Sequence, residues 1–332
     1  MDSTNTDRST SGLPRALGKF EPNEGIRQLS IVTSAYRSEG TIEAFLQRAL
    51  EVAAPLADSI ELVVVDDGSP DRSAEIVRDL ADRDSRIVLV QLSRNFGHHR
   101  ALLTGLEHAR GDLVFLIDSD LEEEPENLAD MLASMRKEGA DVVYGVQRVR
   151  RGGLIERVSG QIFYSAFSLL SEVDLPRNVA TMRLMTARYV RSFLQFKDHN
   201  PVLVPLSLLA GYRQVAYPFE KKSCSETTYS IRRRFSLLLL TLTSFSGKPL
   251  LLIFWMSLVL SLTSFSYGMF VVARAMMGAV QDGWSSLMAA VVFFFSLNAL
   301  LTGIIGLYVK LILEEVKDRP RTVVQDVYRK AP

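Results

Sequence analysis

Two long stretches without a charged side chain constrain this sequence most. They run from Pro249 to Ala273 and from Gly283 to Val309, and the segment between them contains Arg274 and Asp282. Each stretch exceeds the ~20 residues that a helix needs to cross a ~30 Å hydrocarbon layer. Two buried core helices are the alternative, but such helices rarely extend so far without an ionised side chain. The sequence therefore predicts a transmembrane hairpin over residues 249–312.

Basic residues gather on one side of both predicted spans. Arg232, Arg233, Arg234 and Lys248 precede the first span. The residues that follow the second span are Lys310, Lys317, Arg319, Arg321, Arg329 and Lys330. The positive-inside rule places both flanks in the cytoplasm. Residues 1–27 are polar and lack the apolar core of a signal peptide, so we expect a disordered tail there. Together these features predict a multi-pass protein of the inner (plasma) membrane with a cytoplasmic soluble domain.

The composition excludes several classes of protein. The chain has 332 residues, 38 Lys plus Arg against 38 Asp plus Glu, and 47% hydrophobic residues. This balance argues against a largely disordered protein and against nucleic-acid binding driven by net charge. A single cysteine, Cys224, cannot form an internal disulfide, and four scattered histidines do not form a zinc module with it.

The region before the hairpin alternates apolar runs with amphipathic stretches. Strands are predicted at 29–34, 60–65, 87–92, 113–117 and 141–145, and helices at 41–53, 73–83, 100–109 and 125–137. Continuous apolar runs are typical of parallel strands that are covered by helices on both faces. We therefore expect a doubly wound, mostly parallel α/β domain over residues 28–231, with its site beyond the carboxyl ends of the strands.

Carboxylates follow two of these strands. Asp66 and Asp67 end the second strand, and Asp118 and Asp120 end the fourth, where Glu122, Glu123 and Glu124 follow. A turn or helix cap would also explain the first pair. The second group concentrates negative charge at an apolar strand end, which is costly without a cation, and its Asp-x-Asp oxygens suit Mg²⁺ or Mn²⁺. No G-x-G-x-x-G and no P-loop motif occurs, so a diphosphate held by metal and carboxylates is the expectation.

Several motifs in order give a specific resemblance. VVVDDGSPDRS, LSRNFGHHRALLTGLEHARGD, LIDSDLEEEPENL and GLYVKLILEEVKDRPRTVVQDV look like the polyisoprenyl-phosphate glycosyltransferases of glycosyltransferase family 2, in the bacterial type with two C-terminal transmembrane helices. The resemblance implies a GT-A fold, a nucleoside diphosphate sugar donor, a polyprenyl phosphate acceptor, contact with the lipid bilayer and a homo-oligomer of tetramer type.

The resemblance also implies roles for particular residues. Asp66 would contact the nucleotide base, Asp118 the ribose and diphosphate, and Asp120 the metal. The other donor-site residues it implies are Ser34, Ala35, Tyr36, Asp67, Gly68, Arg94 and Asn95. For Arg94 and Asn95, a solvent-capped strand end is the alternative.

The sequence departs from the family pattern at three places. Ser34-Ala35-Tyr36-Arg37-Ser38 replaces Pro-Val-Tyr-Asn-Glu, Thr181 replaces a carboxylate sometimes proposed as a base, and Thr227-Thr228-Tyr229 replaces Ser-Lys-Tyr. A phosphate acceptor needs no base, because its second pKa near ~6 leaves it largely dianionic at pH 7. It needs cations, and the candidates are Arg183, Lys221, Lys222, Arg232, Arg233 and Arg234. For Arg183, a structural ion pair beneath the sheet is the alternative.

These features predict a metal-dependent inverting transferase that moves a sugar onto polyprenyl phosphate at the cytoplasmic face. An interfacial amphipathic helix is predicted at 232–248 and a cytoplasmic tail at 313–332. Two other functions stay open. One is a family 2 transferase with a sugar hydroxyl acceptor, which would need a base carboxylate, and the other is a membrane module without enzymatic activity.

Overall fold

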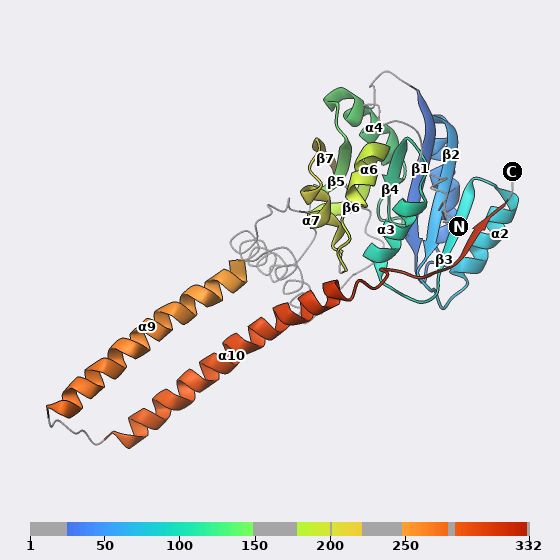
Figure 1. Ribbon diagram of the computed structural model, residues 1–332. Coiled ribbons are helices and arrows are strands. Elements are labelled where there is room, and N and C mark those ends of the chain that lie inside the picture. The colour runs from blue at the N-terminus through green and yellow to red at the C-terminus, as the bar shows by residue number, and fades with distance from the viewer. Residues whose placement is uncertain (1–24, 149–177, 200, 221–247, 278–282, 331–332) are drawn as a thin grey trace, which may run out of the picture.

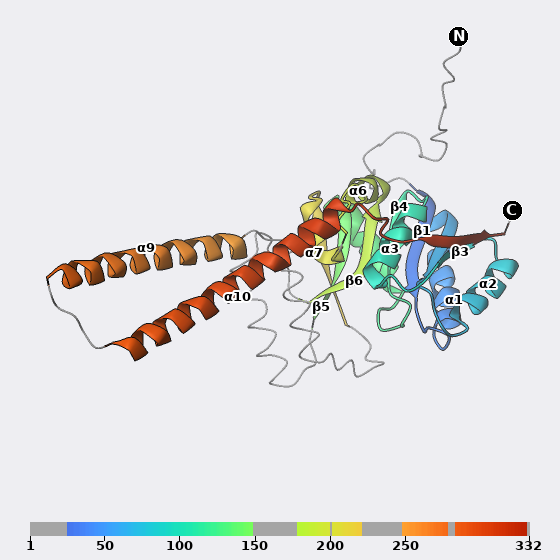
Figure 2. The same ribbon diagram turned by 60° about the horizontal axis from the view of Figure 1, so that its bottom comes forward.

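A computed structural model describes residues 25–148, 178–199, 201–220, 248–277 and 283–330. An α/β domain is built around one twisted sheet, and a long arm of two helices projects away from it (Figure 1). The arm leaves the domain at the side where β5, β6 and β7 lie, and the chain then returns along the opposite edge of the sheet (Figure 2).

The sheet contains eight described strands in the order β7-β5-β6-β4-β1-β2-β3-β8. Their bounds are β1 Ile26–Ala35, β2 Ala57–Asp66, β3 Ile87–Leu92, β4 Leu113–Leu116, β5 Val142–Gln147, β6 Val179–Thr186, β7 Gln214–Phe219 and β8 Val324–Arg329. The central strands β4, β1, β2 and β3 are mutually parallel. Because parallel strands point the same way, their carboxyl ends meet at one edge.

Helices cover both faces of the sheet. Those on one face are α1 Ile42–Ala53, α2 Ser73–Arg83 and α4 Asn127–Glu138, and those on the other are α3 His98–His108, α6 Ala187–Phe193 and α7 Leu203–Leu209. Successive residues of a strand supply opposite faces, so Val64 packs with the first set and Val65 with the second. In α1, Phe45, Ala49 and Ala53 recur every four residues on the buried side.

The predicted α/β alternation is confirmed, with the five strands and four helices predicted between residues 29 and 145 present within a few residues. The sheet is more mixed than expected, however, because β6 runs antiparallel to both β4 and β5, and β8 runs antiparallel to β3. The sequence analysis did not predict β6, β7 or β8. These strands are short or partly polar, and pairing with strands far away in the chain defines them.

The arm consists of α9 Lys248–Met276 and α10 Trp284–Val316. Within the described part of the chain, no helix meets the combined length and apolar character needed to cross a membrane. The two spans predicted over 249–312 thus stay a prediction.

Residues after α10 join the α/β domain. Ser93 N donates to Val323 O at 2.9 Å, and β8 then pairs with β3. Arg78 Nη2 lies 3.1 Å from Asp326 Oδ2, and Arg329 Nη2 lies 3.2 Å from Glu61 Oε2. The segment 313–332, which the sequence analysis treated as a separate tail, therefore contributes a strand to the sheet.

Several predicted features lie outside the described residues. They are the tail up to residue 24, most of the interfacial helix at 232–248, Cys224, and the basic residues Lys221, Lys222, Arg232, Arg233 and Arg234.

Candidate functional site

The carboxyl ends of the four central strands bring most of the predicted site residues together. Ala35 pairs with Asp66 in the β1–β2 register, and Asp67 N donates to Ala35 O at 3.0 Å. On the other side of β1, the Ser119 hydroxyl donates to Ser34 O at 2.9 Å. The turns after β1, β2 and β4 therefore form one continuous surface.

Asp66 presents a buried carboxylate at this edge. Its side chain is 1% exposed, and Oδ1 accepts a hydrogen bond from Ser69 N at 3.2 Å. Oδ2 is buried and has no hydrogen-bond partner among the described residues. Burial raises the pKa of Asp66, while the hydrogen bonds from Ser69 lower it, and burial prevails. A buried oxygen without a partner is an acceptor that a bound ligand can satisfy.

Asp67 connects the turn after β2 to the loop after β3. Its two carboxylate oxygens accept from Phe96 N at 2.7 Å and from Gly97 N at 2.9 Å. Burial raises the pKa of Asp67 although these hydrogen bonds oppose the shift. Gly68 follows with φ +63°, and a Cβ placed there would lie 2.5 Å from Arg94 C. Only glycine permits so close an approach of the two loops.

Arg94 and Asn95 lie in this second loop with exposed side chains. The Arg94 guanidinium lies 4.7 Å from the centre of the Phe96 ring, which is a cation–π contact. At the end of β1, Tyr36 is 43% exposed, and the Arg37 guanidinium lies 5.6 Å from its ring. These side chains border the site without closing it.

Asp118 and Asp120 follow β4 and face the same edge. Asp118 has a side chain that is 19% exposed, and Asp120 Oδ1 accepts from Glu122 N at 3.0 Å. Within the described residues, no three His, Cys, Asp or Glu side chains form a metal-binding group. Mg²⁺ is commonly held by one or two carboxylates together with substrate phosphates and waters. The pair therefore fits an ion whose other ligands come from a bound diphosphate.

His98, which the sequence analysis did not select, connects two of the strand ends. Its Nδ1 lies 2.9 Å from Ser34 Oγ, and its Nε2 lies 3.2 Å from Asp118 Oδ1. Burial lowers the pKa of His98, but the hydrogen bond to Asp118 and the charges of Asp118, Asp120 and Asp67 outweigh it, so the pKa is raised. The sequence signal for this residue was a histidine pair in the short segment between the predicted strand at 87–92 and the predicted helix at 100–109.

His99 lies beside it in a different environment. Its Nδ1 is buried and has no hydrogen-bond partner among the described residues. Burial lowers the pKa of His99 to about 4, and the neighbouring His98 and Arg183 act in the same direction. His99 is therefore uncharged at neutral pH.

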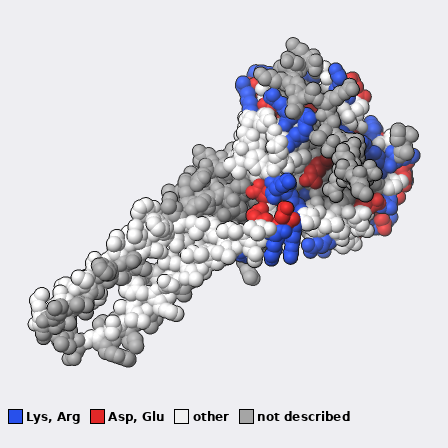
Figure 3. All heavy atoms as spheres, viewed as in Figure 1, with Lys and Arg blue, Asp and Glu red and all other residues white. Residues whose placement is uncertain are grey.

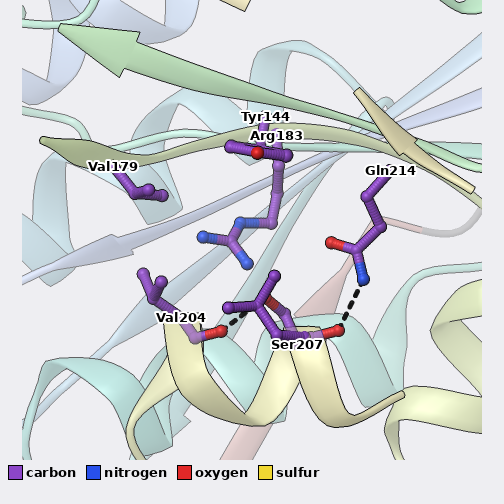
Figure 4. Close-up of a pocket in the computed structure, with 7 residues that line it drawn as sticks. Tyr144, Val179, Arg183, Val204, Ser207 and Gln214 are labelled. Atoms are coloured by element: carbon purple, nitrogen blue, oxygen red, sulfur yellow. Dashed lines mark hydrogen bonds between the residues drawn. The ribbon is translucent and has the colours of Figure 1, made fainter. Parts of the chain in front are cut away.

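Arg183 lies inside the fold. It is 1% exposed and stands opposite Leu116 of β4 and Tyr144 of β5. Its side chain extends from β6 toward α7 (Figure 4), and its Nε donates to Thr181 O at 3.1 Å. Burial lowers the pKa of Arg183, while Tyr189, Glu123 and Asp118 oppose the shift. A narrow pocket surrounds the guanidinium, and its lining residues are Tyr144, Val179, Val204, Ser207, Leu208 and Gln214.

This location bears on both readings of Arg183. A guanidinium so deep inside the fold reaches backbone carbonyls of its own strand, and this favours the structural reading. The charges of Glu123 and Asp118 act on the pKa of Arg183 in the direction opposite to burial. Thr181, the residue that replaces the base of the family pattern, supplies one of the carbonyls that Arg183 contacts.

The chain is similar to several known proteins. YkcC, an uncharacterized glycosyltransferase of Bacillus subtilis, is 34% identical over 91% of this chain and 94% of its own. An undecaprenyl-phosphate 4-deoxy-4-formamido-L-arabinose transferase of Shewanella sediminis is 28% identical over 92% of this chain and 94% of its own. A solved mannosyltransferase of Pyrobaculum calidifontis, in complex with GDP-Man and Mn²⁺, has a TM-score of 0.47 at 19% identity, and the match covers 90% of this chain and 88% of that one. Residues 30–199 match Glycosyl transferase family 2, and the chain is therefore a glycosyltransferase that belongs to this family.

Proposed function

We propose that this enzyme transfers a sugar from a nucleoside diphosphate sugar to polyprenyl phosphate at the cytoplasmic face of the membrane. The observation that carries the proposal is the juxtaposition, at one sheet edge, of the carboxylates of Asp118 and Asp120 with a buried Asp66 oxygen that has no hydrogen-bond partner among the described residues. A relative named for transfer to undecaprenyl phosphate supports the acceptor class.

The donor lies across the ends of β1, β2 and β4. Asp66 Oδ2 accepts a hydrogen bond from the nucleotide base, which supplies the partner that this buried atom lacks. Ser34, Ala35 and the exposed Tyr36 border the nucleoside. The clamp from Asp67 to the Phe96 and Gly97 amides holds the Arg94–Asn95 loop next to it.

Asp118 and Asp120 are the residues that would hold a divalent cation, Mg²⁺ or Mn²⁺, at the donor diphosphate. When bound, such an ion neutralises charge that develops on the leaving diphosphate. The carboxylates themselves orient the donor. Both follow β4, and the Asp118 side chain is 19% exposed whereas Asp120 is exposed at the sheet edge.

The acceptor comes from the lipid layer, and the arm of α9 and α10 holds the enzyme there. Large apolar side chains on the arm are exposed, among them Val259 at 61%, Leu262 at 60% and Phe295 at 76%. Figure 3 shows charged side chains gathered on the α/β domain, whereas the arm is almost without them. A surface of this kind is stable in hydrocarbon and unfavourable in water.

The acceptor phosphate is its own nucleophile. It is largely dianionic at pH 7, so no side chain has to remove a proton, and the Thr181 position needs no carboxylate. The phosphate oxygen attacks the anomeric carbon as the bond to the donor diphosphate breaks, and attack from the opposite face inverts the anomeric centre. Cations position the acceptor, and the candidates are Lys221, Lys222 and Arg232 to Arg234, because Arg183 is buried against backbone carbonyls.

A panel of radiolabelled nucleotide sugars tests the proposal. Membranes that contain the enzyme are incubated with each sugar and with polyprenyl phosphate, and the lipid phase is extracted. We expect one donor to give an organic-soluble product that depends on added polyprenyl phosphate and is absent with Asp120→Ala. Transfer of label only to a sugar hydroxyl, or no transfer with any donor, would contradict the proposed acceptor.

A further inference from the structure

His98 lies within the candidate site, but the proposed reaction assigns it no role. It is the first residue of α3 and lies between the ends of β1 and β4, with Ser34 on one side of its ring and Asp118 on the other. We propose that His98 is a positioning residue that fixes the Asp118 carboxylate for the metal and donor diphosphate, through the chain Ser34–His98–Asp118.

The two ring nitrogens have different partners. An ionised carboxylate can only accept, so the hydrogen on Nε2 is the one that faces Asp118 Oδ1, at 3.2 Å. In the protonated ring Nδ1–H donates to Ser34 Oγ at 2.9 Å, and in the neutral ring the Ser34 hydroxyl donates to Nδ1 instead. In both forms Nε2–H faces the carboxylate.

The ring is held at its base as well as at its tip. The preceding residue is Gly97, whose amide donates to Asp67 Oδ2 at 2.9 Å and whose φ is +101°. The loop that is clamped by Asp67 thus sets where α3 begins and where the imidazole stands. The His98 side chain and the amide of the preceding Gly97 together connect three strand ends, those of β1, β2 and β4.

A side chain that orients a metal-binding carboxylate changes affinity without contacting the substrate. Loss of such outer partners typically weakens metal binding by about 10- to 100-fold. The inference rests on the proposed function, because it assumes that Asp118 serves a cation and a diphosphate. Beyond that function, His98 at the start of α3 fixes the orientation of this carboxylate.

Two substitutions separate the contacts of the ring. In His98→Gln the amide nitrogen can take the place of Nε2 and still donate to Asp118. In His98→Asn the shorter side chain reaches only the position of Nδ1, so it keeps the contact with Ser34 and loses Asp118. His98→Ala loses both contacts, and His108→Ala is the matched control, because His108 ends the same helix and its Nδ1 bonds Thr104 O of that helix at 2.8 Å.

Mn²⁺ binding to the full-length protein provides a readout that does not depend on turnover. Free Mn²⁺ is measured by electron paramagnetic resonance as the ion is titrated with UDP or GDP present, and thermal unfolding of each variant reports folding. We expect His98→Ala and His98→Asn to bind Mn²⁺ about 10- to 100-fold more weakly. His98→Gln should stay within a few-fold of the original protein, and His108→Ala should match it.

The outcomes distinguish the inference from the function beneath it. If the original protein binds Mn²⁺ with nucleotide and all three His98 variants bind equally well, the positioning role is wrong while the proposed function stands. If His98→Gln binds as weakly as His98→Asn although both fold, contact with Asp118 is not what matters, and the inference also fails. If the original protein binds no Mn²⁺ with either nucleotide, both are overturned.

Discussion

Replacing Gly68 with alanine tests how the two loops of the donor site are joined. An alanine at φ +63° pays a left-handed backbone cost of about 1–2 kcal/mol. Its Cβ would also meet Arg94 C at 2.5 Å and Asn95 N at 2.7 Å, and both contacts are backbone atoms that no side-chain rotation can relieve. The Arg94–Asn95 loop must therefore move.

The size of that movement sets the magnitude of the effect. The Cβ contact must lengthen from 2.5 Å to at least 3.4 Å, the lower limit of ordinary contact, so the loop shifts by about 0.9 Å. The same shift breaks or weakens the 2.7 Å hydrogen bond from Phe96 N to the buried Asp67. A hydrogen bond to a charged group contributes about 1.5–3 kcal/mol, so the total destabilisation is about 2.5–5 kcal/mol.

Gly139→Ala is the matched control. Gly139 has a similar φ of +57° at the end of α4, but an added Cβ meets nothing within 4 Å. It should cost only the backbone term of about 1–2 kcal/mol. The excess of about 1.5–3 kcal/mol over the control, at about 2–4 °C per kcal/mol, should place the Tm of Gly68→Ala roughly 3–12 °C below that of Gly139→Ala.

The assay is thermal unfolding of the full-length variants, followed by donor binding. Gly139→Ala should keep the donor affinity of the original protein, and Gly68→Ala should lose it, because its loop borders the donor. Equal Tm values for the two variants, together with normal donor binding by Gly68→Ala, would refute the reasoning about loop approach.

Four further predictions address the metal, the pH response, the acceptor and the topology. Asp120→Ala should abolish transfer and Asp118→Ala should weaken donor and metal binding together, and activity that survives EDTA would contradict a metal role. The pKa of His99 is about 4 in the folded protein against an ordinary 6.5, so as the pH falls the unfolded protein binds a proton at this ring before the folded protein does. The free energy of unfolding therefore decreases as the pH falls from 6.5 toward 4. His99→Gln should remove about 3 kcal/mol of this acid sensitivity, measured as unfolding free energy against pH, and an unchanged pH profile would show that the ring is not buried neutral. Arg183, which is 1% exposed and donates to backbone carbonyls of its own strand, should act as a structural residue: Arg183→Lys should lower the Tm and leave the acceptor KM of the folded variant unchanged, whereas a raised acceptor KM with an unchanged Tm would support the acceptor role. In a Cys224→Ser background, an impermeant thiol reagent applied to intact cells should label Gly283→Cys and spare Gln325→Cys, and the reverse pattern would contradict the predicted orientation.

The sequence alone determined the central part of the fold and half of the site. Apolar runs such as Ile60 to Val65 are long enough and β-branched enough to form buried parallel strands in almost any context. Once the strands are parallel, their carboxyl ends share an edge, so Asp66 and Asp118 had to lie near each other. This conclusion needs only local patterns and one topological rule.

Only the tertiary structure placed β8 and the antiparallel strand β6. β8 is a short, largely exposed strand whose partner β3 lies more than 200 residues earlier, and its sequence has no strong strand pattern of its own. The burial of Arg183 also depends on β6, because that strand inserts between β4 and β5 and carries the side chain inside.

The connections between the loops of the site were likewise invisible in the sequence. His98 is separated from Ser34 by 64 positions, and Asp67 from Phe96 by 29. A hydrogen bond over such a distance leaves no periodic pattern in the chain, because it depends on where two backbones stop and how closely they approach. At Gly68 the two loops approach so closely that an added Cβ would lie 2.5 Å from Arg94 C, and neither composition nor residue spacing indicates this.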